Sequence, residues 1–258
     1  MLVRNWMCRD VITIDKNDSM QDAARLLKKY GISRLPVMKK GKLVGIVTDR
    51  DLKRASASDA NTLEIHDLIY LLSEIKVRDI MTKDPVTVPP DYTVEETAEI
   101  LLNNKISGVP VVDGEGYVVG IITQTDLFRT MVTYTGLGKR GIQFAFMLED
   151  RPGSIKEVAD IIRKYGGRMV SILSAYQRVI NGYRKVYIRM YGVERQKLEY
   201  LKKELKEKST LLYVIDHREN KREIFEEEFR STIHRLVPSS QKNENTKKKV
   251  KDIKQHKN

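Results

Sequence analysis

The chain contains an internal repeat, which constrains its fold more than any other feature of the sequence. Residues 7–38 and 81–112 align without a gap, at an offset of 74 residues. One additional residue in a turn of the second copy shifts the offset to 75, where "GIVTDRD" at 45–51 matches "GIITQTD" at 120–126. Self-similarity at a fixed spacing indicates two copies of one supersecondary unit.

Local signals predict the same order of elements in both copies. The short β-type runs "VITI" and "PVTV" each precede a helix start, at Ser19 and at Thr93, where Glu96 completes a capping box. Gly31 lies where a left-handed C-terminal cap is expected. "LPVM" and "LVGIVT", joined by "KKGK", predict a hairpin, and a further helix begins after Thr48. Each copy is therefore predicted to fold as β-α-β-β-α.

The duplicated motif Gly, two apolar residues, Thr, two variable residues and Asp resembles the end of a CBS domain, together with "GISRLPVM" and "KISGVPVV". The resemblance implies a Bateman module, in which two units pair and bind adenine nucleotides in the cleft between them. It assigns Asp51 and Asp126 to ribose and Thr48 and Thr123 to the phosphate side. It also implies an adenine pocket of Thr13, Ile14, Ile32 and Pro36 in the first unit, and of Thr87, Val88, Ile106 and Pro110 in the second.

The first copy carries basic residues that the second lacks, since Arg34, Arg50 and Lys53 match Gly108, Thr125 and Phe128. Phosphate favours the basic side, which adds Arg34 and Arg50 to the expected nucleotide site. Two alternatives stay open. The Thr and Asp of each motif are three residues apart, which is also the spacing of a capping box, and Arg50 and Lys53 can be ordinary solvated helix residues.

The second half of the chain predicts a different unit. "IQFAFMLE" alternates as a strand, Ser154 and Glu157 have capping-box spacing, and a hairpin is expected around Asn181-Gly182. "TLLYVID" is expected as the last strand, which gives the ferredoxin-like order β-α-β-β-α-β. With "EDRPGSIKEVADIIRKYGG", this order resembles the ACT domain, which binds amino acids at interfaces between copies. The resemblance implies an effector loop of Asp150, Pro152, Gly153, Ser154 and Ile155, although an ordinary turn with a helix cap explains the same residues.

The same order of elements also occurs in RNA-recognition domains. Tyr183 offers one stacking aromatic, but Lys185 occupies the second stacking position, so the sequence does not favour a nucleic-acid partner. The net charge of +12 does not change this, because the last twenty residues supply +5 of it without any aromatic residue.

We expect a mixed α/β (α+β) fold with a ferredoxin-like second half. "REIFEEEFRSTIHRL" has a helical apolar stripe. The expected segments are a first repeat at 1–56, a helical linker at 57–76, a second repeat at 77–135, an ACT domain at 140–217, an amphipathic helix at 218–237 and a disordered basic tail at 238–258.

Composition excludes several classes of protein. A single cysteine forms no disulfide within the chain, and the four histidines lack ligand spacing, so we expect no metal site. Apolar runs are too short to cross a bilayer and the amino terminus lacks the apolar centre of a signal peptide, which predicts a cytoplasmic protein without a membrane partner. No nucleophile and base pair, and no phosphate loop, is recognisable, so no catalytic residues are expected.

Two CBS units followed by an ACT domain resemble the AcuB-type family, which is associated with acetoin utilization. We therefore predict a regulatory sensor without enzymatic activity, a homodimer that acts on an unknown partner protein. Its ligand is expected to be AMP, ADP, ATP or S-adenosylmethionine, with an amino acid as a second ligand at the ACT domain. The alternatives are a protein that binds RNA or another polyanion through the second domain and the tail, and an enzyme with unrecognised chemistry.

Overall fold

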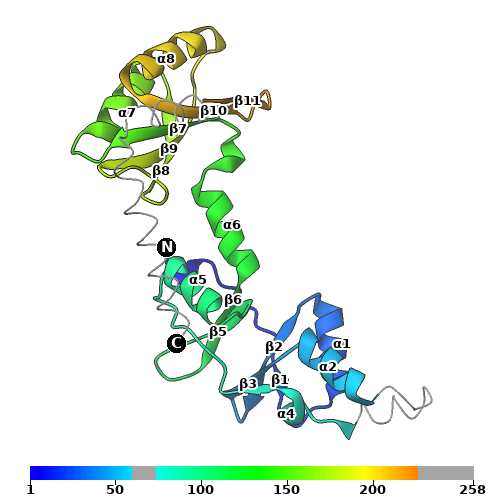
Figure 1. The fold of residues 1–258 in the computed structure, drawn as a ribbon. Coiled ribbons are helices and arrows are strands. Elements are labelled where there is room, and N and C mark those ends of the chain that lie inside the picture. Colours follow the sequence, from blue (N-terminus) through cyan, green and yellow to red (C-terminus); the bar gives the residue numbers. More distant parts are fainter. Residues whose placement is uncertain (60–73, 226–258) are drawn as a thin grey trace, which may run out of the picture. The chain divides into compact units, whose positions relative to one another are not determined.

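The structure, a computed structural model, describes residues 1–59 and 74–225. The chain divides into two compact units, Met1–Met131 and Val132–Asn258, and each is described by itself (Figure 1). Most of the linker predicted at 57–76 and all of the tail predicted at 238–258 lie outside the described residues. Within the described part of the chain, no helix combines the length and the apolar character that crossing a membrane requires.

The first unit contains both repeats; the first has the predicted order of elements, and the second has it without the leading strand. The first repeat comprises β1 (Ile14–Asp15), α1 (Met20–Tyr30), β2 (Arg34–Lys39), β3 (Lys42–Thr48) and α2 (Asp49–Asp59). The second comprises α5 (Val94–Asn103), β5 (Gly108–Val112), β6 (Val118–Thr123) and α6 (Gln124–Tyr134). The strand expected at "PVTV" is reduced to a single parallel bridge between Val88 and Val111. The hairpins β2–β3 and β5–β6 are antiparallel, as predicted.

The predicted helix caps of the repeats are confirmed. Ser19 caps α1 in a capping box with Asp22, and Thr93 caps α5 in a box with Glu96. Gly31 ends α1 with a φ of 63°, in the left-handed region that glycine enters without steric cost.

The two repeats exchange the chain segments that precede them. α4 (Val77–Ile80) and β4 (Thr82–Lys83) lead into the second repeat, yet β4 pairs with β3 and Val77 is buried in the core of the first repeat. In the reverse direction, Cys8 forms a bridge with Ile121 in β6, and Val3 in η1 (Val3–Asn5) is buried in the core of the second repeat. Each hydrophobic core is therefore completed by the segment that leads into the other repeat.

The glycine that begins each heptapeptide makes this exchange possible. A Cβ atom at Gly45 would meet Met81 Sδ and would lie 3.0 Å from the carbonyl oxygen of Thr82. A Cβ atom at Gly120 would meet Met7 Sδ and would lie 3.1 Å from the carbonyl oxygen of Cys8. The same packing twice, at matching positions, shows why the motif starts with glycine in both copies.

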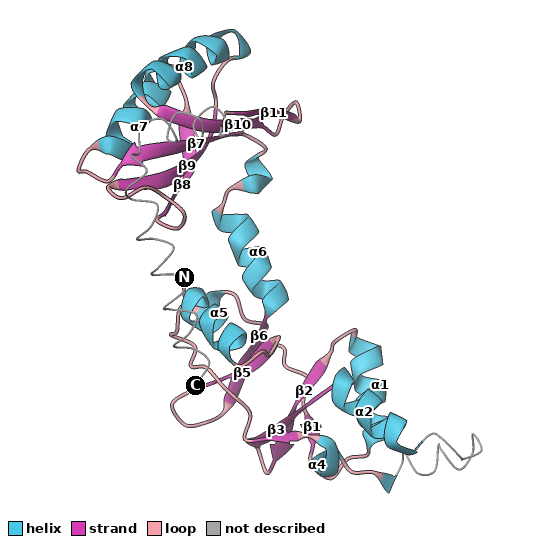
Figure 2. Cartoon of the chain, viewed as in Figure 1, coloured by secondary structure: helices cyan, strands magenta, loops and turns pink. Residues whose placement is uncertain are grey.

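The second unit is a five-stranded antiparallel sheet with two helices on one face (Figure 2). After η2 (Leu137–Lys139), its elements are β7 (Ile142–Glu149), α7 (Ser154–Lys164), β8 (Arg168–Ala175), β9 (Tyr183–Tyr191), α8 (Arg195–Lys208), β10 (Thr210–Asp216) and β11 (Lys221–Ile224). The strand order is β11-β10-β7-β9-β8. Phe144 and Phe146 of β7 pack in the core with Val158 and Ile162 of α7 and with Leu201 and Leu205 of α8. The order β-α-β-β-α-β is present as predicted, with one further strand.

Three expectations for this unit are wrong in detail. β10 is not the last strand, because β11 pairs with it in an antiparallel hairpin. The amphipathic helix predicted at 218–237 does not include its first residues, since Lys221–Ile224 form β11, and from residue 226 onward it lies outside the described residues. Ser154 and Glu157 form no capping box, because Gly153 at a φ of 89° is the N-cap of α7 and the Glu157 carboxylate pairs with Arg151 instead.

Candidate functional site

The first unit contains a cleft of about 680 Å³ between residues of both repeats. On one side it is lined by the ends of β2 and β3 and by the first turn of α2. On the other side lie the loop before β5 and the first residue of α6. The chain after β4 closes the cleft, because the exchange of leading segments brings it onto the first repeat. The lining residues are Ser33, Arg34, Ile46, Thr48, Asp49, Arg50, Asp51, Arg54, Thr82, Asp84, Pro85, Val86, Lys105, Ile106, Ser107, Gly108 and Gln124.

The first heptapeptide places a carboxylate at the amino end of α2. One oxygen of Asp51, Oδ2, accepts hydrogen bonds from the Thr48 backbone N–H at 2.9 Å and from the Thr48 hydroxyl at 2.7 Å. The other oxygen, Oδ1, accepts from Arg54 Nη2 at 2.6 Å. Asp51 is 8% exposed, while the Arg54 side chain is 76% exposed. The capping interpretation of Thr48 and Asp51 is therefore confirmed, and it uses only one of the two carboxylate oxygens.

The second heptapeptide repeats this geometry. Asp126 Oδ2 accepts from the Thr123 backbone N–H at 2.9 Å and from its hydroxyl at 2.7 Å. Asp126 Oδ1 lies farther from its arginine, at 3.4 Å from Arg129 Nη1. Thr123 and Asp126 do not line the cleft described above, so the structure presents the two motifs to different surroundings.

Arg34 reaches from the first repeat into the second. Its Nη2 donates to the Ser107 hydroxyl at 2.8 Å and to the Ser33 hydroxyl at 3.2 Å. Its Nη1 is buried without a hydrogen-bond partner and lies against Gly108, where a Cβ atom would displace it. Burial lowers the pKa of Arg34 from its ordinary value, while the nearby carboxylates of Asp49 and Asp126 oppose that shift. The cleft therefore holds a desolvated cation with unused hydrogen-bonding capacity.

The lining combines charge with an apolar wall. Its cations, Arg34, Arg50, Arg54 and Lys105, outnumber its carboxylates, Asp49, Asp51 and Asp84. Ile46, Pro85, Val86 and Ile106 supply apolar surface, and Val86 is 39% exposed. A cleft of this size with a few convergent polar groups has the characteristics of a small-molecule site, for which volumes of about 300–1,000 Å³ are typical.

The structure brings together only part of the predicted nucleotide site. Arg34, Thr48, Arg50, Asp51 and Ile106 line the cleft. Ile14 and Val88 are buried in the cores of their repeats, at 3% and 0% exposed. The other predicted residues lie outside the lining of the cleft: Thr13, which is exposed, Pro36 and Pro110, which are buried, and Ile32 and Thr87, which are half-buried.

Sequence reasoning missed Asp84, Pro85 and Val86. It assigned the lining of each pocket to one repeat, whereas these residues come from the segment that precedes the second repeat and lies on the first. The matching glycines that begin the two heptapeptides, Gly45 and Gly120, were the available signal, but they do not reveal which chain segment packs against them.

In the second unit, one arginine holds the predicted effector loop. Arg184 Nη2 donates to the Ser154 hydroxyl at 3.1 Å, and Arg184 Nε lies 3.5 Å from Asp150 Oδ1. Pro152 and Gly153 form the turn between them, and Ile155 packs at the edge of the core. Tyr183, considered for RNA stacking, packs half-buried beside Ala145, Met147 and Leu212. Among the described residues, no cluster of three or more His, Cys, Asp or Glu side chains could hold a metal ion.

Comparisons with known proteins concern the first unit. The model of the CBS domain family matches residues 3–58 and 77–133. A CBS domain-containing protein of Dictyostelium discoideum is 33% identical over 133 residues, which cover 51% of this chain and 92% of that protein. Inosine-5'-monophosphate dehydrogenase of Korarchaeum cryptofilum is 40% identical over 124 residues, which cover 48% of this chain but only 23% of the dehydrogenase. A solved CBS domain pair in complex with 5'-methylthioadenosine and S-adenosyl-L-methionine is 34% identical, covers 52% of this chain and 97% of that one, and gives a TM-score of 0.45.

Proposed function

This chain belongs to the CBS domain family, with its two repeats forming a tandem pair, and we propose that the pair is a regulatory module that binds an adenine nucleotide in the cleft of the first unit. The observation that carries the proposal is the position of Asp51 at the amino end of α2, in a cleft lining that it shares with Arg34, whose Nη1 has no hydrogen-bond partner among the described residues.

Each part of a nucleotide has a counterpart in this cleft. Asp51 Oδ1 is available to the ribose hydroxyls, because the hydrogen bond that it accepts among the described residues comes from the exposed Arg54. The amino end of α2 and the guanidinium groups of Arg34 and Arg50 favour phosphate, through backbone N–H groups and charge. Ile46, Val86 and Ile106 offer the base an apolar surface.

The charge of the cleft favours nucleotides that carry phosphate over S-adenosylmethionine. The sulfonium group of that ligand is a cation, and it would approach the like charges of the half-buried Arg34 and the exposed Arg50. We therefore expect AMP, ADP and ATP to bind more tightly than S-adenosylmethionine.

The test is a calorimetric and thermal-unfolding titration of nucleotide-free protein with AMP, ADP, ATP and S-adenosylmethionine. At a hundred times Kd, a ligand should stabilise the first unit by about 2.7 kcal/mol. Asp51→Asn should lower the affinity at least tenfold. The same titration of Asp126→Asn tests whether the second heptapeptide also contributes to nucleotide affinity.

Asp22→Asn is the matched control, since Asp22 completes the capping box of α1 with Ser19 as Asp51 does with Thr48, but does not line the cleft. It should weaken the fold without changing nucleotide affinity. If Asp51→Asn and Asp22→Asn bind every nucleotide as well as the wild type does, the motif is only a helix cap and the proposal is wrong.

For the second unit we propose a ferredoxin-like domain of the ACT type, which serves as a dimerisation or effector module. Its element order and the strand order β10-β7-β9-β8 support this proposal. An amino acid at Asp150, Pro152, Gly153, Ser154 and Ile155, the homodimer and the AcuB-type link to acetoin utilization stay predictions. Light scattering with and without nucleotide tests the homodimer, and titration with the twenty amino acids tests the loop.

A further inference from the structure

The second unit contains a small cavity on the face of the sheet opposite to its helices. Its volume is about 100 Å³, and it is lined by Thr135, Gln143, Ser171, Leu173, Tyr187 and Arg189. Side chains alternate between the two faces of a strand. Phe144 and Ile188 belong to the core under the helices, so their neighbours Gln143, Tyr187 and Arg189 lie on the other face.

Arg189 is buried at this cavity without a counter-charge. It is 5% exposed, its Nε donates to the carbonyl oxygen of Thr135 at 2.7 Å, and its Nη2 donates to Gln143 Oε1 at 2.6 Å. Its Nη1 is buried without a hydrogen-bond partner. Both partners of the guanidinium are neutral, and no carboxylate of the described residues forms an ion pair with it within 4.0 Å. Burial lowers the pKa of Arg189, as expected for a desolvated cation.

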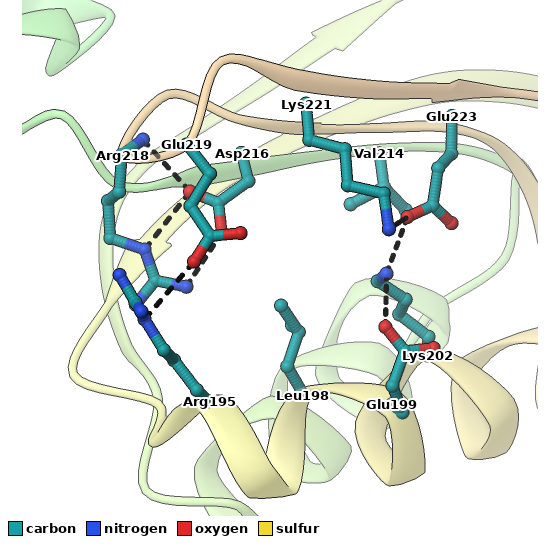
Figure 3. A pocket seen from close by; sticks show the side chains of 10 residues that line it. All are labelled: Arg195, Leu198, Glu199, Lys202, Val214, Asp216, Arg218, Glu219, Lys221 and Glu223. Atoms are coloured by element: carbon teal, nitrogen blue, oxygen red, sulfur yellow. Dashed lines mark hydrogen bonds and ion pairs between the residues drawn. The ribbon is translucent and has the colours of Figure 1, made fainter.

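A second cavity of the same unit shows what a compensated site looks like. It has about 120 Å³ between α8, β10 and β11, and each of its cations has a carboxylate (Figure 3). Lys202, 6% exposed, pairs with Glu199 at 2.7 Å and with Glu223 at 2.6 Å. The remaining pairs are Arg195 with Glu219, Arg218 with Asp216 and Lys221 with Glu223. The charges of that cavity are satisfied within the protein, whereas the charge of Arg189 is not.

We propose that the cavity at Arg189 is a binding site for a small carboxylate. A buried cation without a counter-charge is costly, and a bound anion offsets that cost. The planar guanidinium of Arg189 is suited to a carboxylate, which it can bind through charge-assisted hydrogen bonds. The volume of the cavity, about 100 Å³, suits an anion of a few carbon atoms and is far smaller than the cleft of about 680 Å³ in the first unit. Leu173 provides an apolar surface for the hydrocarbon part.

The site is connected to the chain that enters the second unit. Thr135 is the residue directly after α6, and its carbonyl oxygen accepts from Arg189 Nε and, at 2.9 Å, from the Ser171 hydroxyl. The next residue, Gly136, has a φ of 69° and packs against Val170. An anion beside Arg189 would therefore lie next to the hydrogen bonds that hold this connection to the sheet.

The experiment uses the full chain and sodium acetate as the probe, at constant ionic strength, with sodium chloride and sodium phosphate as comparison anions. The melting temperature of the second unit should rise saturably with acetate, at lower concentrations than with chloride or phosphate. Arg189→Met should abolish this rise. Lys202→Met is the matched control, because it removes a buried cation that already has carboxylate partners, and it should keep the acetate response.

Gln143→Glu provides a test if Arg189→Met fails to fold. A carboxylate at position 143 would lie beside Arg189 Nη2 and supply the missing anion from within the chain. The variant should melt higher than the wild type without acetate, and its acetate affinity should fall at least tenfold. An equal, unsaturated response of the wild type and either variant would mean that the cavity holds only water, and it would overturn the proposal. Saturable binding of phosphate or chloride but not of acetate would overturn the assignment to a carboxylate.

Discussion

At the residue scale, one carboxylate oxygen of Asp51 belongs to the helix cap, and the other is the oxygen that we propose binds the ligand. Oδ2 holds the amino end of α2 through Thr48, and Oδ1 accepts a hydrogen bond from the exposed Arg54. The spacing of Thr48 and Asp51 was sufficient to predict the cap, because a capping box depends on local geometry alone. The same spacing at Ser154 and Glu157 failed, since Arg151 pairs with the Glu157 carboxylate and Gly153 takes the N-cap.

Arg34 should discriminate between ligands by their phosphate charge. Arg34→Met is expected to lower the affinity for AMP and ATP by about ten- to a hundredfold, because a charge-assisted hydrogen bond contributes about 1.5–3 kcal/mol. The affinity for adenosine should change little, since adenosine carries no phosphate. Isothermal titration calorimetry with the three ligands measures both effects. An equal loss for adenosine and AMP would show that Arg34 only supports the shape of the cleft.

Gly108→Ala should reproduce the effect of Arg34→Met, because the added Cβ atom occupies the position of Arg34 Nη1. Gly114→Ala is the control, since a Cβ atom there has no neighbour within 4 Å. Nucleotide titration of both variants checks this prediction. If Gly108→Ala binds AMP as the wild type does, Arg34 does not need its present position to hold phosphate.

His217 should make the second unit less stable as the pH falls. Burial and the nearby cations Arg189 and Arg222 lower its pKa below 6.5, and its Nε2 is buried without a hydrogen-bond partner. Below pH 6.5, His217 therefore binds a proton more readily in the unfolded chain than in the folded protein. The free energy of unfolding consequently decreases as the pH falls from 6.5 through the lowered pKa. Calorimetry at pH 7.5 and 5.5 should show a smaller loss for His217→Gln than for the wild type. Equal losses would contradict the prediction.

At the element scale, the order of helices and strands could be predicted, but the pairing between repeats could not. Hydrophobic period and caps are local signals, so "IQFAFMLE" and "TLLYVID" match β7 and β10. The pairing of β4 with β3 is a contact between segments 36 residues apart, such as Ile46 and Thr82, and neither segment reveals its partner. The cleft residues that were missed, Asp84 to Val86, follow directly from that pairing.

Gly45→Ala should destabilise the first unit by about 1–3 kcal/mol, the usual cost of overpacking. Trp6, the single tryptophan, packs against the core of the second repeat, so its fluorescence during urea unfolding reports this unit. Met81→Ala should restore part of the loss in Gly45→Ala, because it removes one of the two groups that the added Cβ atom meets. An unchanged urea midpoint in Gly45→Ala would contradict the tight packing of the exchanged segment.

At the scale of the whole molecule, the two proposed sites belong to different units. The nucleotide cleft lies within Met1–Met131, and the cavity of Arg189 lies within Val132–Asn258. The sequence predicts a change of pattern after residue 135, where the second repeat ends and a new series of strands and helices begins, whereas the chain divides after Met131. The cavity at Arg189 could not be predicted from the sequence. In the sequence, Arg189 is an ordinary charged residue of a strand with alternating polarity, and only the fold shows that it is buried.

Each ligand should stabilise its own unit in the intact chain. ATP should raise the melting temperature of the first unit, which Trp6 fluorescence reports. Acetate should raise the melting temperature of the second unit, whose transition is seen by calorimetry but not by Trp6 fluorescence. Differential scanning calorimetry combined with fluorescence measures the two transitions together. If either ligand shifts both transitions equally, the units unfold as one cooperative body and the signals cannot be separated in this way.

The exchanged leading segments bear on how such a chain can arise. A polypeptide with one repeat would have no segment from a second copy to pair with its heptapeptide strand, and Val77 or its counterpart Val3 would be missing from its core. Two such polypeptides could complete each other by trading these segments, as swapped dimers do. Gene duplication and fusion would then have joined two polypeptides that already completed each other's cores. The exchange of segments would in that case be older than the single chain that now contains both repeats.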